Sequence, residues 1–317
     1  MAESRLAVYG AIVANVAIAA TKFAVAGVTG SSAMLAEAIH SLVDSGNGAL
    51  LLFGLNRSEQ PATEEHPFGH GKELYFWSLI VGVLIFGLGG GISLFEGLQH
   101  LREPPPLNEP LWNYVVLAAA AVFEGISFTL AWRQFARQRG DTPLWQALHV
   151  SKDPTTYTVL AEDFAALIGL AIAAAGVYLS HRLQMPRLDA LASVLIGLLL
   201  AGVAVLLIRE ARGLLVGEGV KPETARAIRA IAADEPAVRR VGPVLSMYVG
   251  AEDVLVTLDI GFAGTTPVSE VALAIQRIEH RIRERLPKIR RISIEAVSEL
   301  PILLATPTNA AAPGTTT

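Results

Sequence analysis

The chain has 317 residues, of which 52% are hydrophobic and 17% are charged, and its mean hydropathy is +0.46. Because a soluble domain usually carries about 25% charged residues, this composition argues against a plain globular enzyme. The segment 217–300 alone holds 24 charged residues, 12 basic and 12 acidic, so a membrane portion followed by a water-soluble portion is expected. A net charge of −4 gives no basic footprint for nucleic acid, and the lack of cysteine excludes disulfides and thiolate metal sites.

Six apolar runs are long enough to cross about 30 Å of hydrocarbon as helices. They are Leu6–Val28, Ser32–Leu55, Leu74–Leu98, Leu111–Trp132, Thr158–Leu179 and Leu188–Ile208. Nine basic residues flank these runs on the side of the two chain ends and three flank them on the other side. The positive-inside rule therefore places both termini in the cytoplasm. We expect a multi-pass protein of the bacterial inner membrane, with a six-span transmembrane domain over residues 1–216.

The soluble segment 217–300 shows the pattern of a small α/β domain. Its expected elements are a helix, a hairpin of two strands, a second helix and a last strand: Pro222–Asp234, Val244–Val249, Val254–Phe262, Val268–Leu286 and Arg291–Val297. This order predicts a compact ferredoxin-like domain on the cytoplasmic side. Residues 301–317 have a composition that cannot build a core, so we expect a disordered tail.

The second apolar run contains four polar residues, which are Glu37, His40, Asp44 and Asn47. Spacings of three, four and three residues put them on one helix face. Polar and ionisable residues at membrane depth mark ion or substrate pathways by default. An imidazole and a carboxylate four residues apart can grip one divalent cation. A hydrogen-bonded pair between helices, or a water-filled crevice without metal, would explain the same residues.

The fifth run supplies two adjacent acids, Glu162 and Asp163. Neighbouring helix positions differ by about 100°, so the two cannot point equally at one site. Two carboxylates facing a His/Asp pair on another span would make a cage of oxygen and nitrogen donors. Such a cage suits Zn²⁺, or Mn²⁺ and Fe²⁺ less selectively. Alternatively, Glu162 caps a neighbouring hydroxyl or pairs with Lys22.

Other features of the runs predict packing rather than chemistry. Glu124, in the fourth run, is expected to be a partner for another helix. Gly87 and Gly91 form a face of small residues in the third run, which favours close helix packing.

The loop after the second run, His66-Pro-Phe-Gly-His70-Gly-Lys-Glu73, holds two histidines four residues apart. Glu64 and Glu65 precede them, so the loop has the donors to hold a metal ion on the cytoplasmic side. A tight Pro/Gly turn that orders the start of the third run is the alternative interpretation.

Together these motifs resemble the cation diffusion facilitator family. The resemblance rests on Glu-Ala-Ile-His40-Ser-Leu-Val-Asp44, the loop His66–Glu73, Lys152-Asp-Pro154 and Asp189, and it covers about residues 5–298. It implies a homodimeric exporter that moves Zn²⁺ or a related divalent cation out of the cytosol in exchange for protons. It also implies a transport site between the second and fifth spans. The segment 217–300 would be a metallochaperone-like dimerisation domain.

Carried over residue by residue, the family pattern assigns metal ligands to His40, Asp44 and Asp163. The fourth ligand of many relatives falls on Val159, which cannot bind a metal. Either Glu162 replaces it through a local distortion, or water completes the site. The loop histidines His66 and His70 match a second metal site of some members, whereas His280 is the one histidine of the soluble domain.

Two other classes of protein fit the sequence less well. An intramembrane metalloenzyme would need a metal and a base, typically His-Glu-x-x-His on one helix, and the sequence has no such motif. A structural or scaffolding membrane protein would not need His40, Asp44 and Asp163 inside lipid, and a metal-binding scaffold that transports nothing stays as the alternative. We therefore expect a secondary transporter rather than an enzyme, without a permanently bound cofactor. Its substrates would be Zn²⁺ above all, then Mn²⁺, Fe²⁺, Co²⁺ or Cd²⁺, with H⁺ as counter-ion, and its partners a second copy and the lipid membrane.

Overall fold

The structure is a computed structural model that describes residues 2–104, 110–139 and 154–297. It divides into two compact units, Met1–Val216 and Gly217–Thr317, and each has its own hydrophobic core. Lys152 and the expected tail 301–317 lie outside the described residues.

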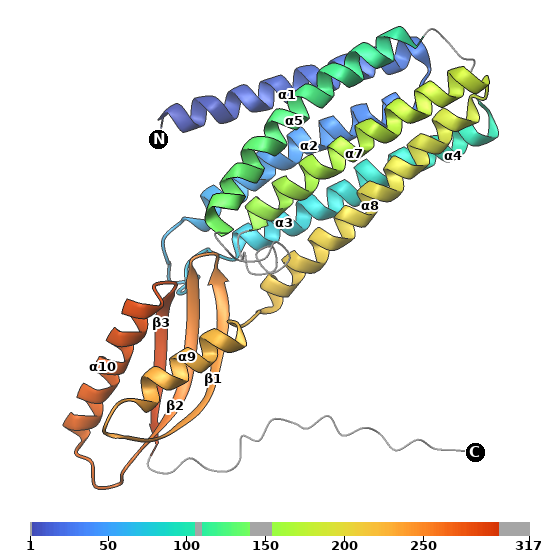
Figure 1. Cartoon of the computed structure of the whole chain (residues 1–317). Coiled ribbons are helices and arrows are strands. Elements are labelled where there is room, and N and C mark those ends of the chain that lie inside the picture. The colour runs from blue at the N-terminus through green and yellow to red at the C-terminus, as the bar shows by residue number, and fades with distance from the viewer. Residues whose placement is uncertain (1, 105–109, 140–153, 298–317) are drawn as a thin grey trace, which may run out of the picture. The chain divides into compact units, whose positions relative to one another are not determined.

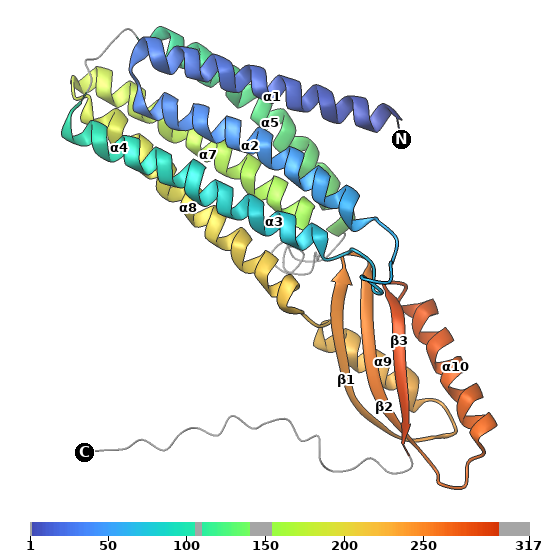
Figure 2. The ribbon, with the colours of Figure 1, turned by 180° about the vertical axis from the view of Figure 1, so that it is seen from behind.

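Long helices build the first unit and run side by side in both views (Figures 1 and 2). They are α1 (Ala2–Thr29), α2 (Ser32–Ser58), α5 (Leu111–Arg139), α7 (Pro154–Leu183), α8 (Arg187–Val216) and a continuous rod of α3 (Glu73–Leu84), η1 (Ile85–Gly91) and α4 (Ile92–Arg102). Each predicted apolar run lies within one of these segments. The helices extend beyond the runs because backbone hydrogen bonds continue where side chains become polar.

Four helical segments are long and apolar enough to cross a membrane, and they are Glu73–Arg102, Leu111–Arg137, Tyr157–Leu183 and Arg187–Val216. In the described part of α1 the apolar stretch is shorter, Val16–Thr29. Helix α2 is long enough, but the polar residues on one of its faces lower its apolar character. Six spans therefore remain a prediction as far as α1 and α2 are concerned.

The middle segment of the rod formed by α3, η1 and α4 is η1, a π-helix with four glycines in seven residues. A Cβ added to Gly90 would lie 3.1 Å from the carbonyl oxygen of Gly197, so the backbones of the rod and of α8 touch there. Within the described part of this chain the predicted face does not pack on another helix: a Cβ at Gly87 would meet nothing within 4 Å, and one at Gly91 would meet only Phe86 of the same rod. The wider π turn shifts the helix face and brings Gly90 to the contact instead.

Asp189, in the first turn of α8, caps the N-terminus of α2. Its carboxylate accepts hydrogen bonds from the hydroxyls of Ser31 and Ser32 at 2.8 and 3.1 Å and from the backbone N–H of Ser32 at 2.7 Å. The N–H of Met34 donates to Ser31 Oγ at 3.1 Å, as in an ordinary N-cap. A negative charge at a helix N-terminus is also favourable electrostatically. Helices α2 and α8 are therefore fastened together at this end.

The second unit is a three-stranded sheet with two helices. Its elements are α9 (Pro222–Ala233), β1 (Val238–Gly250), β2 (Asp253–Phe262), α10 (Val268–Arg285) and β3 (Ile289–Val297). Strands β1 and β2 form an antiparallel hairpin, and β3 lies parallel to β2 on its other side. Buried residues of both helices and of the central strand, such as Ile228, Leu258 and Ile278, form one core.

The predicted α/β order is confirmed, with two differences. Strand β1 begins at Val238 rather than Val244 and includes Pro243, which lies at a register shift of this edge strand. Proline is tolerated at edges and bulges because it donates no ladder hydrogen bond. A ferredoxin-like fold has a further strand before its first helix, whereas the sheet in the described residues has three strands.

Candidate metal centre

One face of α2 carries the polar row, by which we mean Glu37, His40, Asp44 and Asn47. The row is about 15 Å long at 1.5 Å per residue. Glu37, His40 and Asn47 are buried, and Asp44 is half-buried. Buried polar groups are costly unless they find partners, so the neighbouring helices must supply them.

Helix α7 supplies partners for one end of the polar row. Asn47 Nδ2 donates to Glu162 Oε1 at 2.9 Å, and the carboxyl groups of Asp44 and Glu162 interact electrostatically. Further along, Glu37 Oε1 faces Gly169, where a Cβ would collide with it. Asp44 follows Glu37 by seven residues and Glu162 precedes Gly169 by seven. The two helices therefore run antiparallel with the polar row against α7.

Asp163 points toward a different helix from its neighbour Glu162. Ser127 Oγ, on α5, donates to Asp163 Oδ2 at 2.9 Å. This divergence follows from the 100° between adjacent helix positions. Asp163 still interacts electrostatically with Asp44 and with Glu124. Four carboxyl groups thus act on one another between α2, α5 and α7, although no three ligating side chains of the described residues already converge as a metal site.

His40 and Val159 flank this group of acids. His40 is buried one turn before Asp44, and the charged group that acts on it is Lys22 of α1. In the antiparallel register of α2 and α7, Val159 lies opposite Asn47. Its apolar side chain leaves Glu162, one turn away, as the carboxylate that α7 presents to α2.

Lys22 has a partner that the sequence did not predict. Its Nζ lies 3.2 Å from Glu37 Oε2 and donates to Ser41 Oγ at 2.7 Å. The proposed pairing of Lys22 with Glu162 is therefore wrong. A lysine in an apolar helix signals that a partner exists, and the i, i+4 spacing of Glu37 and Ser41 offers two acceptors on one face.

The loop after α2 brings His66 and His70 face to face, with ring centroids 4.4 Å apart. Gly69 has a φ of +78°, and its N–H donates to the carbonyl oxygen of His66 at 2.8 Å. The expected tight turn is thus present. His66 is exposed, whereas His70 is buried and its Nδ1 has no hydrogen-bond partner in the described part of the chain.

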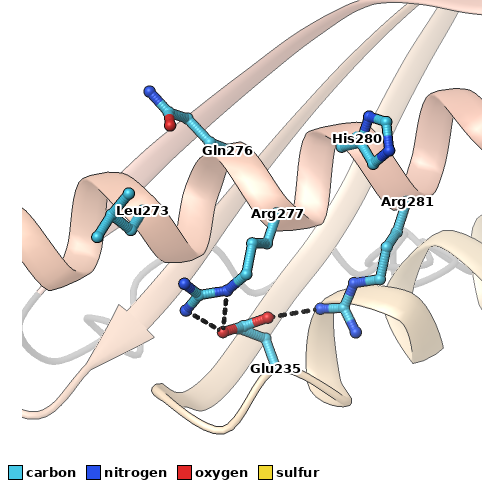
Figure 3. A pocket seen from close by; sticks show the side chains of 6 residues that line it. All are labelled: Glu235, Leu273, Gln276, Arg277, His280 and Arg281. Atoms are coloured by element: carbon cyan, nitrogen blue, oxygen red, sulfur yellow. Dashed lines mark hydrogen bonds and ion pairs between the residues drawn. The ribbon is translucent and has the colours of Figure 1, made fainter.

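The second unit has a pocket of about 400 Å³, and Figure 3 shows the side chains that line it. Its lining includes Glu235, Arg277, His280 and Arg281. Buried Glu235 accepts hydrogen bonds from both arginines, and its bond to Arg277 raises the pKa of that guanidinium above its usual value. His280 points away from this cluster in the close-up. Because both arginines donate hydrogen bonds to the Glu235 carboxylate, that carboxylate is not free to bind a cation. The pocket therefore presents positive charge rather than cation ligands.

Comparison with known proteins places these features in a family. The model of the cation efflux transmembrane domain matches residues 8–216. "Proton-coupled zinc antiporter SLC30A9, mitochondrial" of Mus musculus is 35% identical over 238 residues, which are 74% of this chain and 42% of that protein. Metal tolerance protein C4 of Arabidopsis thaliana is 30% identical over 346 residues, 94% of this chain and 75% of that protein. Cation-efflux pump FieF of Cronobacter sakazakii is 29% identical over 289 residues, 88% and 91% of the two chains.

The chain spans less than half the length of the Mus musculus relative. The matched domain includes the polar row, the acids of α7 and the histidine loop. Four candidate membrane spans and relatives named as pumps and antiporters make the chain an integral membrane protein of a transporter family rather than an enzyme family. It belongs to the cation efflux family, the cation diffusion facilitators.

Proposed function

We propose that the protein exports a divalent metal cation from the cytosol in exchange for protons, with Zn²⁺ as its main substrate. One observation carries the proposal: the hydrogen bond of 2.9 Å between Asn47 and Glu162 brings an acid of α7 to the polar row of α2, and Asp163 is the next residue of α7. The zinc and proton named for the Mus musculus relative support the choice of ions. Mn²⁺, Fe²⁺, Co²⁺ and Cd²⁺ are alternative substrates with related ligand preferences.

The ligands in this proposal are His40, Asp44, Glu162 and Asp163. Zn²⁺ accepts four such donors in a tetrahedron, at about 2.0–2.2 Å. Glu162 takes the role that Val159 cannot fill, since it already lies beside Asp44. Asp163 would exchange its hydrogen bond from Ser127 for the cation.

Proton exchange follows from the electrostatic interaction between Asp44 and Glu162. Two buried carboxyl groups at one site repel each other when both are charged, so the pair holds a proton while no cation is bound. A metal ligand must be deprotonated, so an arriving cation displaces that proton. Uptake of metal and release of H⁺ are thereby linked at one site.

We also propose a second cation site at His66 and His70, whose rings already face each other. Changing both to Ala should lower the Zn²⁺ stoichiometry of the purified protein by about one per protomer and leave part of the transport. Isothermal titration calorimetry measures the stoichiometry. Unchanged stoichiometry would mean that the motif only shapes the turn.

The architecture that this function requires has six spans, with both termini on the cytoplasmic side. Residues 1–216 would form the transmembrane domain and residues 217–300 a cytoplasmic dimerisation domain. Two copies would associate through both parts. The bacterial inner membrane remains our prediction for the location.

The test is metal uptake into vesicles that contain the purified protein. Inside-out vesicles with an acidic lumen should accumulate Zn²⁺ and lose lumenal H⁺, and the rate should follow the pH gradient. Parallel assays with Mn²⁺, Fe²⁺, Co²⁺ and Cd²⁺ give the preference. A zinc flux that ignores pH gradients of either sign would exclude antiport, and the absence of any metal flux would exclude transport.

A further inference from the structure

A lysine and a glutamate are buried together at the opposite end of the polar row from Asn47. Lys22 and Glu37 are both 0% exposed, with 3.2 Å between Nζ and Oε2. Removing two charges from water is expensive, and apolar residues of similar volume often serve as well or better. Packing alone therefore gives no reason for this ion pair.

Glu37 also retains binding capacity that the pair does not use. Its Oε1 is buried and has no hydrogen-bond partner among the described residues. That oxygen fills the place of the side chain that Gly169 lacks. Glu37 lies one helical turn from His40 and two turns from Asp44, on the same face. Without Lys22 it would be a free carboxylate in line with the proposed ligands.

Resting on the transport function proposed above, we propose that Lys22 is a tethered cation that occupies Glu37 and keeps it out of the substrate's ligand set. A divalent cation that enters the polar row then stops at Asp44 and Glu162 and does not advance to a further carboxylate. Transport needs binding that is weak enough to reverse, and an added carboxylate would hold the cation too tightly. Lys22 is in this sense a positioning residue that sets affinity.

Because Lys22 and Glu37 carry opposite charges, replacing one or the other should change the affinity for Zn²⁺ in opposite directions. Lys22→Met leaves a lone carboxylate in the polar row, so Zn²⁺ should bind about tenfold more tightly and turn over more slowly. Glu37→Gln leaves a lone ammonium, which should weaken Zn²⁺ binding about tenfold. The double variant carries neither charge, so its affinity should return to within about threefold of the wild type. Calorimetry with Zn²⁺ on the full-length protein measures affinity, and vesicle uptake measures turnover.

A purely structural tie between α1 and α2 predicts something different. Both single variants would then lose affinity and thermal stability together, and the double variant would be no better than either, which would overturn the proposal. Ser41→Ala is the matched control: it removes one hydrogen bond of Lys22, keeps both charges and should leave the affinity unchanged. If the single variants do not fold, Lys22→Arg and the double variant decide. Both should bind Zn²⁺ like the wild type, and a tenfold loss in either would refute the tethered cation.

The wild-type protein separates this inference from the proposed function. If it binds Zn²⁺ but its vesicles take up none, transport is refuted, while opposite shifts in affinity would still support the role of Lys22. If it transports Zn²⁺ and both single variants shift affinity in the same direction, only the inference fails.

Discussion

Two adjacent acids of α7 face different helices, and this separation defines the chemistry of the site at the scale of single residues. Glu162 accepts a hydrogen bond from Asn47 on α2, whereas Asp163 accepts a hydrogen bond from Ser127 on α5. A cation between the three helices would draw on both acids, so their substitutions should not have equal effects.

Glu162→Gln keeps the size of the side chain and its capacity to bond Asn47 but removes the charge beside Asp44. Zn²⁺ affinity should fall by roughly 10- to 100-fold, as for a marginal or supporting ligand. Asp163→Asn should abolish transport. Ser127→Ala is the control, because it removes the hydrogen bond of Asp163 and leaves its charge. Normal zinc affinity and transport in Glu162→Gln would show that the cation does not bind where α2 meets α7.

The spacing of polar residues predicted the polar row and the two acids, because helical periodicity decides which residues share a face. The partner of Lys22 could not be predicted in this way. Helix α1 is apolar around most of its surface, so its sequence does not indicate which side contacts α2. Ser127 was missed for a similar reason: a lone serine in an apolar helix carries no signal until the neighbouring helix is known.

At the scale of elements, the close backbone contact between η1 and α8 determines how the rod of α3, η1 and α4 packs on α8. Glycine spacing predicted such a contact, but the π turn of η1 moved it from Gly87 and Gly91 to Gly90. A period of 3.6 residues describes an ordinary α-helix, so a local change of pitch falsifies face assignments downstream of it. In the second unit, likewise, Pro243 interrupts the strand pattern, so the sequence predicted that β1 begins at Val244 and missed its first residues from Val238 on.

Gly90→Ala and Gly87→Ala form a matched pair that tests this contact. The added Cβ of Gly90→Ala would press on the backbone of α8 and should lower stability by about 1–3 kcal/mol. Gly87→Ala adds the same group where nothing lies within 4 Å, so its stability should equal or slightly exceed that of the wild type. Thermal unfolding in detergent compares the two. Equal destabilisation by both changes would contradict the packing described.

At the scale of the whole molecule, each of the two units has its own hydrophobic core, and we expect the two to respond independently to substitution. The proposed transport site lies entirely in the first unit. Glu235, with its two arginine partners, lies entirely in the second. A change that weakens one core should therefore leave the chemistry of the other unit intact.

Glu235→Gln tests this independence. It replaces charged hydrogen bonds from Arg277 and Arg281 by weaker ones, so the second unit should unfold at a lower temperature than in the wild type. The Zn²⁺ affinity of the first unit should not change. Calorimetric unfolding and zinc titration of the same preparation measure both quantities. A coupled loss of zinc affinity would show that the sheet domain contributes to the transport site.

Because Asp189 holds the N-terminus of α2 against α8, a tilt of α2 about this point would move the residues farther along the helix most. Asp44 lies 12 residues beyond Ser32, which is about 18 Å along the helix. If the joint at Asp189 acts as a pivot, a tilt of only about 10° displaces the Asp44 carboxylate by about 3 Å. That displacement exceeds a zinc–oxygen bond of about 2.0–2.2 Å, so a small rotation suffices to form or break the coordination of a cation.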